Sequence, residues 1–325
     1  MRLSLKNIIT PSIPLAILSI MACFSLWAIN YLKSAFGGHP VVQLPQTTYQ
    51  LEFLNNTGIS NLISIAFTLT NAFLLTQLNN KFTIIRTRTF LPILIFVLLQ
   101  CTWSSSHLAD VSDITATLFI FSLFYFLEMY RNPMAVEQAY MGCLLIGIGS
   151  IFINNLVLIV PIIWIGFGMF QSLSLRTFLA SIFGIITPWI FFVSGTYFFQ
   201  PDIDFVQLFN FSYLMQFDFT HYMLRNLIYI GLMAIVFLIC FVGLYSNSRA
   251  DATHTRVKLN FLLLLFIGIT AMGALFFQQH VGFLPLIALL YSVIVSHPFT
   301  LKHNDFYSIV FIVFCVINIA FAVSK

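Results

Sequence analysis

The sequence predicts an all-α protein, a polytopic transmembrane bundle of about eleven helices with its N-terminus in the cytoplasm. Hydrophobic residues make up 60% of the 325 positions and charged residues only 7%, whereas an average soluble domain is about 25% charged. Apolar runs of roughly 17 to 25 residues follow one another along the chain, each able to cross ~30 Å of hydrocarbon as a helix. The composition therefore excludes a water-soluble globule.

No polar stretch is long enough to bury a core of its own, so residues 1–325 are predicted to form a single integral membrane domain without a separate soluble domain. This organisation argues against a nucleotide-binding domain and against a nucleic-acid partner. The five cysteines lie in five different apolar runs and have no C-x-x-C spacing, which is typical of small core residues. We accordingly predict no metal site and no cofactor.

Eleven runs are predicted to cross the membrane, and the seventh carries a predicted kink at Pro188. They cover about 12–32, 58–78, 90–106, 114–130, 137–154, 156–172, 176–199, 226–246, 260–279, 282–296 and 306–323. The tenth run is barely long enough, and it crosses only where the bilayer thins or flanking residues help. Without it the count falls to ten.

The basic residues predict the sidedness of the chain. Eleven of the 14 Lys and Arg residues fall at the inner side when the N-terminus is cytoplasmic, and only Lys33, Arg225 and Lys325 fall outside. The inner set is Arg2, Lys6, Lys81, Arg86, Arg88, Arg131, Arg176, Arg249, Arg256, Lys258 and Lys302. This positive-inside bias favours a multi-pass protein of the bacterial inner membrane with its C-terminus outside.

Polar and small residues within the spans indicate helix packing. Asn61, Ser64, Thr68 and Asn71 form one stripe on the second span, because they are three or four residues apart. Such a stripe is more typical of packing than of a hydrated cavity. Glycines that permit close helix approach lie in the fifth and sixth spans, at Gly142, Gly147, Gly149, Gly166 and Gly168.

The segment before the fourth span carries His107, Asp110 and Asp113, each three residues apart. A helical segment would present them as a metal-ligand face. We prefer a structural interpretation in which Asp113 or Ser112 caps the fourth helix and the other side chains face water.

One short string occurs twice, as Arg-Thr-Phe-Leu at 88–91 and at 176–179, and a parallel internal duplication or chance would both produce it. The longer strings TRTFLPILIFVLL (87–99) and SLRTFLASIFGIITPWIFF (174–192) resemble an uncharacterised family of multi-span bacterial envelope proteins over most of the chain. The resemblance implies a membrane fold and no particular activity.

The stretch 201–225 concentrates acids, a histidine, an arginine and aromatics between two apolar runs. If residues 217–226 begin the eighth span as a helix, Asp218, His221, Tyr222 and Arg225 share one face near its outer end. The Arg225 guanidinium offers a planar fork of donors suited to phosphate, His221 can shuttle a proton, and Asp218 can orient either of them.

Further acids of the outer side are Glu52 in the first outer loop and Asp202 and Asp204 beside the predicted phosphate site. Outer-loop carboxylates on a many-span scaffold are similar in architecture to polytopic glycosyltransferases that act on lipid-linked sugars. That resemblance implies a catalytic role for Glu52, although the class usually has an acid earlier in this loop. It also implies membrane lipids and a lipid-linked phosphate substrate as partners.

Two function classes remain open at this point. The first is handling of lipid-linked or glycan envelope precursors at the outer face, as a glycosyl- or related transferase if the protein is an enzyme. The second is a non-catalytic scaffold or accessory subunit of an envelope complex, or a facilitator of a neutral solute. Ion-coupled transport and proton pumping are disfavoured, because no ionisable residue is predicted at mid-depth.

The sidedness can be tested with single cysteines at Gln46, Gln207 and Thr253 in a cysteine-free background. An impermeant thiol reagent applied to intact cells is expected to label the first two positions and not the third, because basic loops stay in the cytoplasm. Labelling at Thr253 but not at Gln207 would reverse the topology.

Overall fold

The computed structural model describes residues 13–36, 57–86, 89–103, 107–199, 224–247, 252–276, 280–301 and 305–323, and the fold is all-α. These residues form eleven α-helices and one 3-10 helix. The elements are α2 (Ile13–Phe36), α3 (Thr57–Phe82), α4 (Leu91–Thr102), α5 (Val111–Glu128), α6 (Val136–Phe152), η3 (Asn154–Ile159), α7 (Val160–Met169), α8 (Leu175–Phe199), α10 (Leu224–Asn247), α11 (Thr253–Leu275), α12 (His280–Leu301) and α13 (Asp305–Val323).

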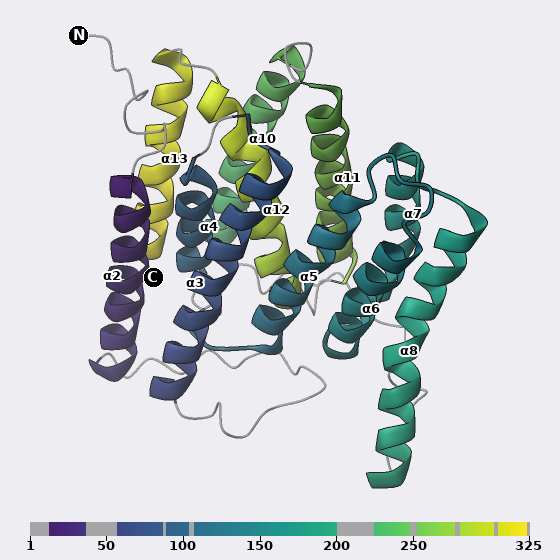
Figure 1. Cartoon of the computed structure of the whole chain (residues 1–325). Helices are drawn as coiled ribbons and strands as arrows, with labels where there is room; N and C mark the ends of the chain where they lie inside the picture. Colours follow the sequence, from purple (N-terminus) through teal and green to yellow (C-terminus); the bar gives the residue numbers. More distant parts are fainter. Residues whose placement is uncertain are drawn as a thin grey trace.

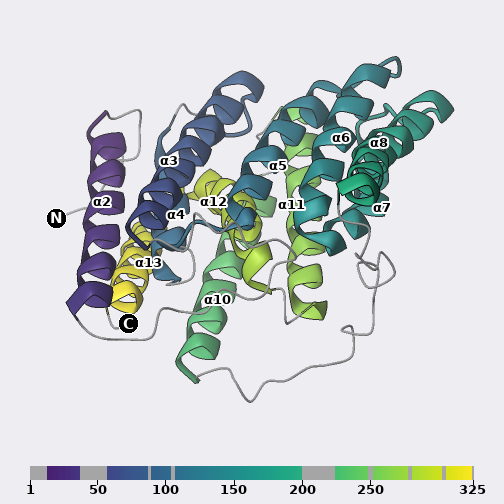
Figure 2. The same ribbon diagram turned by 90° about the horizontal axis from the view of Figure 1, so that it is seen from below.

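The helices stand side by side, with α2 and α8 at opposite edges of the bundle and α12 between them (Figures 1 and 2). Successive helices run in opposite directions, so their ends gather at two faces. We call the face that holds the ends of α3 and α5 and the start of α11 the basic end, at the top of Figure 1. The opposite face, where α5 and α10 begin, is called the α10 end.

The chain is a multi-span integral membrane protein, since seven of its described helices are long and apolar enough to cross a membrane. These are α3, α5, α8, α10, α11, α12 and α13. Shorter apolar helical runs are Leu91–Thr102, Val136–Phe152 and Asn154–Met169. Every run that the sequence predicts as a span therefore contains helix. Helix α2 has 24 residues, so only the three shorter runs offer less than a full crossing by length.

The third predicted span, 90–106, is wrong in its length. Helix α4 has 12 residues, about 18 Å at the usual rise of an α-helix, and all of them are buried. Its neighbours are α2, α3, α12 and α13, and the helix ends where Trp103 turns to an extended conformation. A helix enclosed in this way has no lipid to face, so its continuous apolar sequence reflects burial against other helices.

The tenth predicted span, 282–296, is also wrong in its bounds. Helix α12 runs over 22 residues from His280 to Leu301 and includes both Pro285 and Pro298. It reaches across the hydrocarbon layer without a thinned bilayer, since 22 residues extend about 33 Å. The Ser292 and Thr300 hydroxyls donate to the Leu289 and His297 carbonyl oxygens at 2.7 and 2.8 Å, which keeps this polar stretch helical.

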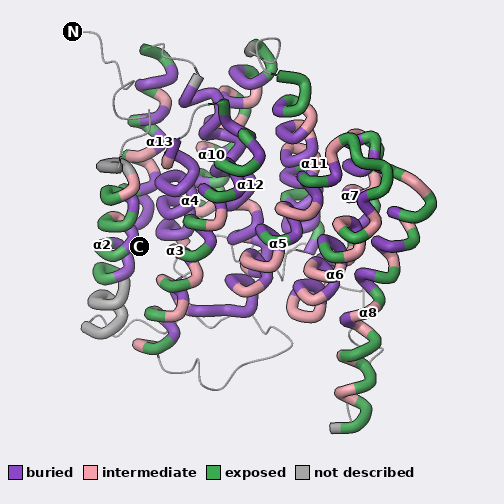
Figure 3. Tube along the Cα trace, viewed as in Figure 1, coloured by how far each residue is buried: buried purple, intermediate pink, exposed green. Residues whose placement is uncertain are grey.

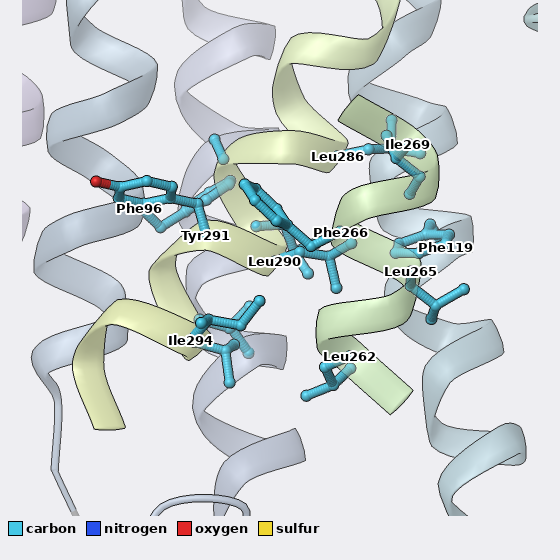
Figure 4. Close-up of a cluster of buried hydrophobic side chains, with 14 of the residues drawn as sticks. Phe96, Phe119, Leu262, Leu265, Phe266, Ile269, Leu286, Leu290, Tyr291 and Ile294 are labelled. Carbon is cyan, nitrogen blue, oxygen red and sulfur yellow. The ribbon is translucent and has the colours of Figure 1, made fainter. Parts of the chain in front are cut away.

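The centre of the core lies between α11 and α12, closed by Phe96 of α4 and Phe119 of α5 (Figure 4). Phe266 and Tyr291 meet there with ring centroids 6.1 Å apart. The Tyr291 hydroxyl donates to the Met233 carbonyl oxygen of α10 at 3.1 Å. Figure 3 shows the resulting pattern, with α4 and α12 buried along most of their length and α2 and α8 exposed on their outer faces.

Helices α6 and α8 approach each other closely because glycines face the contact. A Cβ atom on Gly184 would lie 2.5 Å from the Tyr140 carbonyl oxygen, and one on Gly147 would lie 3.0 Å from the Ile185 carbonyl oxygen. The Trp189 indole N–H of α8 donates to the Ser150 hydroxyl of α6 at 2.8 Å. Of the glycines that the sequence predicts at close contacts, Gly168 has open space around it and the other four do not.

Three helices that end at the basic end are followed by a residue in the left-handed conformation, at Thr83 after α3, Arg131 after α5 and Gln171 after α7. This conformation closes helix C-termini. The Arg131 N–H donates to the Phe170 carbonyl oxygen at 2.9 Å and so joins two of these turns. The basic end is therefore a connected surface.

The two Arg-Thr-Phe-Leu strings begin helices at different registers. Leu91 is the first residue of α4, whereas Leu179 is the fifth of α8. Thr89 receives the Leu91 N–H before α4 starts, while Thr177 lies inside α8 and receives the Ser174 N–H at its N-cap. The strings thus occupy non-equivalent positions.

Substitution of Gly184 by Ala is expected to destabilise the α6–α8 pair by about 1 to 3 kcal/mol, because the new methyl group meets backbone. Gly195 in the same helix has nothing within 4 Å of its Cβ position, so Gly195→Ala is the matched control. Thermal unfolding of the purified variants in detergent measures the difference. Equal melting temperatures for the two variants would contradict the close packing.

Candidate functional site

Of the site residues predicted from the sequence, the structure describes Arg225. The remaining six, Glu52, Asp202, Asp204, Asp218, His221 and Tyr222, lie outside the described residues. The described part of the site therefore consists of Arg225 and the residues around it at the α10 end.

Arg225 lies in the first turn of α10 and is half-buried. Its guanidinium carbon is 5.3 Å from the centroid of the Phe321 ring of α13. A guanidinium over an aromatic face is favoured by the ring quadrupole. The α10–α13 contact therefore fixes where this cation stands at the end of the bundle.

The ring beneath Arg225 belongs to an aromatic group of three residues, Trp103, Tyr229 and Phe321. Tyr229 and Phe321 stack with centroids 4.3 Å apart, and Trp103 meets Tyr229 edge-on at 5.9 Å. The Tyr229 hydroxyl lies 2.9 Å from Asn318 Oδ1 and 3.2 Å from Thr102 Oγ1. Helices α4, α10 and α13 are thus joined by aromatic packing and by a buried polar contact just below Arg225.

A second polar group lies beside this one and begins at His107. Its Nε2 is 3.0 Å from the Cys101 carbonyl oxygen, and its ring packs edge-on against Trp27 of α2 with centroids 4.3 Å apart. The next residues are tied to α3, because the Ala109 N–H donates to the Ser60 hydroxyl at 2.9 Å. The segment that leads into α5 is therefore held between α2, α3 and α4.

Asp110 and Asp113 form a reciprocal capping box at the start of α5, which confirms that Asp113 takes part in capping. The expectation that the other side chains face water is wrong: His107 is 4% exposed, Asp110 8% and Asp113 3%. The acids are buried because the segment runs beneath α2 and α3 and not across the surface. An acid at this position accepts hydrogen bonds from the first N–H groups of the helix, which have no acceptor within the helix. Its negative charge is also favoured by the helix dipole at the N-terminus.

Burial raises the pKa of the Asp110 carboxyl above its ordinary value of 3.8, and hydrogen bonds from Val111 and Ser112 offset part of that rise. One of its oxygens, Oδ2, is buried and has no hydrogen-bond partner among the described residues. Desolvation disfavours the charged form of a carboxyl group, and a neutral carboxyl has a proton to donate. Asp110 is therefore a candidate for proton exchange at this end of the bundle.

The polar stripe of α3 serves packing, as the sequence predicts. Ser64, Thr68 and Asn71 are buried. The Thr117 hydroxyl of α5 lies 2.8 Å from Asn71 Oδ1 and 3.0 Å from the Asp113 carbonyl oxygen. The stripe thus connects α3 to the first turns of α5, close to the two buried acids.

Sequence reasoning missed the aromatic group and the Trp27–His107 contact, since Trp27 and Tyr229 lie within apolar runs. Asn318 offered a signal, because it is a lone amide in the otherwise apolar last run. Within the described part of the chain, no three His, Cys, Asp or Glu side chains are grouped so as to hold a metal ion. The chemistry available at the α10 end is thus a cation over aromatic rings beside a buried carboxyl group.

Comparison of the chain with protein-family models, with curated proteins and with solved structures gives no match.

Substitution of Asp110 by Asn tests the burial of this acid. The folded state holds the Asp110 proton more tightly than the unfolded state, so the stability of the native protein is expected to fall as the pH rises from about 3.8 through the raised pKa. Asp110→Asn retains a capping side chain and cannot ionise. As the pH rises over this range, the melting temperature of the wild type is therefore expected to fall relative to that of Asp110→Asn.

Asp110→Ala is the control, because it removes the cap and is expected to be about 1 kcal/mol less stable than Asp110→Asn at every pH. Thermal unfolding in detergent between about pH 4 and about pH 8 gives the comparison. Parallel pH profiles for the wild type and Asp110→Asn would show that Asp110 is not desolvated.

Proposed function

We propose that the protein is an eleven-span protein of the bacterial inner membrane that handles a lipid-linked, phosphate-bearing precursor of the cell envelope at the outer face. The α10 end is the outer face in this proposal, and the N-terminus is cytoplasmic. The distribution of charge supports that orientation: Lys81, Arg86, Arg131 and Lys258 are near the basic end, while Arg225 is at the α10 end. Membership in the envelope family that the sequence resembles is part of the proposal.

The observation that carries the proposal is the position of Arg225 over Phe321, at the first turn of a membrane-spanning helix. Tyr and Trp side chains are enriched where a bilayer meets water, and Trp103 and Tyr229 lie directly beside this pair. In this proposal the guanidinium stands at the depth of lipid headgroups. Its fork of N–H donors matches the oxygens of a phosphate, and the aromatic face below holds its plane in place.

The residues outside the described part retain in this proposal the roles that the sequence suggests. Asp218 and His221 orient and transfer a proton, with Tyr222, Asp202 and Asp204 beside the bound headgroup. Glu52 contributes a carboxylate from another outer loop. The reaction class, if the protein is an enzyme, is a glycosyl- or related transfer from or to a lipid-linked substrate.

A second candidate function is that of an accessory subunit in an envelope complex, and the placement of α8 favours it. This helix packs chiefly against α6 and extends beyond its neighbours at the α10 end (Figure 1). The apolar side chains of its last turns are open, with Phe198 80% exposed. A protruding apolar helix end offers a surface for another membrane protein.

Variants of Arg225 test the first candidate. Arg225→Lys keeps the charge but loses the fork, and Arg225→Ala loses both, so we expect a graded loss of co-purified phospholipid or lipid-linked precursor and of function in complementation. A loss of about tenfold in affinity for Arg225→Ala corresponds to one charge-assisted hydrogen bond.

Arg86→Ala is the matched control, since Arg86 is an exposed arginine near the basic end. Quantitative lipid mass spectrometry at equal protein level provides the measurement. Full lipid retention and full function in both Arg225 variants would refute the phosphate site and leave the accessory-subunit function.

A further inference from the structure

A cavity of about 610 Å³ opens at the basic end of the bundle, between the end of α5 and the start of α11. Its lining residues are Tyr130, Arg131, Ala252, Thr253, His254 and Lys258. Two of them are cations, one is a histidine, and none is acidic. A cavity of this size and composition suits a small anionic ligand better than a cation or an apolar molecule.

Lys258 is the central charge of this cavity and is only 9% exposed. Its ammonium group lies 3.3 Å from the Phe82 carbonyl oxygen and 5.1 Å from the centroid of the Phe82 ring. An ammonium group has three N–H donors, and within the described chain this carbonyl is its one hydrogen-bond acceptor and no carboxylate forms an ion pair with it. A buried ammonium group is normally paired with an anion. Lys258 has no such partner among the described residues, so its burial favours a bound anion.

The nearest acid of α5 does not supply that anion. Glu128 is engaged by Lys81 of α3, whose ammonium group lies 2.5 Å from Glu128 Oε1. The residues that follow α5 instead bring a second cation, because Arg131 lines the cavity with its guanidinium carbon 5.4 Å from the Tyr130 ring centroid. The cavity therefore carries a net positive charge from described side chains.

The position of Arg131 is fixed by its backbone. Its φ of 58° lies in the left-handed region, and its N–H is bonded to the Phe170 carbonyl oxygen. Lys258 is fixed in a similar way, since the Thr255 hydroxyl in the preceding turn donates to the Thr83 carbonyl oxygen at 3.3 Å. Both cations are thus carried on anchored backbone segments, which lowers the ordering that a ligand requires.

The start of α11 adds to the positive potential of the cavity. Its N-cap residue is Ala252, which has no side chain to receive the first N–H groups of the helix, and the first turn contains no acid. Such N–H groups favour an anion, although they are a supplement here to the charges of Lys258 and Arg131.

We infer that this cavity binds a phosphate group, carried by an anionic phospholipid headgroup or by a small soluble phosphate. Basic pockets between membrane helices at the membrane surface are suited to acidic headgroups, and both sources present the same phosphate oxygens to Lys258 and Arg131. The site lies at the opposite end of the bundle from Arg225, so it is independent of the function proposed above.

Thermal unfolding of the full-length protein in an uncharged detergent tests the inference with two probes. The first is short-chain phosphatidylglycerol, compared with phosphatidylcholine of the same chain length. The second is inorganic phosphate, compared with chloride at equal ionic strength. Either probe is expected to raise the melting temperature of the wild type with a saturable dependence on concentration, because a ligand of the native state stabilises it by mass action. Phosphatidylglycerol alone would identify a lipid headgroup, and a response to inorganic phosphate would identify a soluble phosphate.

The variants Lys258→Met and Arg131→Asn each remove one cation from the cavity. Met retains the apolar stem of Lys258, and Asn tolerates the left-handed conformation of Arg131, so both are expected to fold. Each is expected to weaken binding of the active probe about tenfold, as the loss of a charge-assisted hydrogen bond would.

Arg86→Gln is the control, since it removes an exposed cation of the same face outside the cavity. It is expected to retain the response of the wild type. The inference is overturned if neither probe stabilises the wild type beyond its reference, or if Arg86→Gln loses as much of the response as Lys258→Met. It is also overturned if Lys258→Met and Arg131→Asn respond fully, because Lys258 then serves only to neutralise the C-terminus of α3.

Discussion

Polar groups inside this bundle are shielded from water, so most of them depend on a partner within the chain. Hydroxyl groups meet the requirement locally: Thr76 donates to the Ala72 carbonyl oxygen and Thr270 to that of Phe266, one turn back in each helix. Longer side chains meet it across helices, as Trp189 does with Ser150. Contacts of the second kind decide which helices are neighbours, because an unpaired indole or amide in hydrocarbon would cost more than the contact itself stabilises.

The helices could be predicted from the sequence, and their roles could not. Apolarity finds all the helical runs because burial in protein and burial in lipid demand the same side chains. For the same reason it cannot tell α4, which is enclosed on every side, from a helix that faces lipid. The predicted tenth span ended at Ser296, whereas α12 continues through His297 to Leu301, since a hydroxyl such as that of Ser296 bonds to its own helix and lets the helix continue.

The candidate site, like the fold, could be predicted from the sequence only in part. Arg225 was chosen from the sequence as the one arginine of the outer set, and its half-buried place over Phe321 suits an interface residue. The burial of Asp110 could not be foreseen, because a polar segment between two apolar runs normally faces water. The segment around Asp110 is excluded from solvent by contacts with Trp27, Ser60 and Asn71. These residues belong to helices that are distant in the sequence, so the contacts exist only in the folded bundle.

The charges at the two ends are not explained by helix dipoles. Lys81 and Arg131 stand near helix C-termini, where cations are favoured, but Arg176 and Arg256 lie in the first turns of α8 and α11, where they are disfavoured. Lys and Arg are thus concentrated at the basic end even where the helix dipole disfavours them. This bias reflects the requirement that basic residues remain on one side of the membrane. Its consequence at the start of α11 is a concentration of positive charge that the described chain does not balance. Lys258 is buried within it, and a bound anion would offset the repulsion that the membrane topology imposes there.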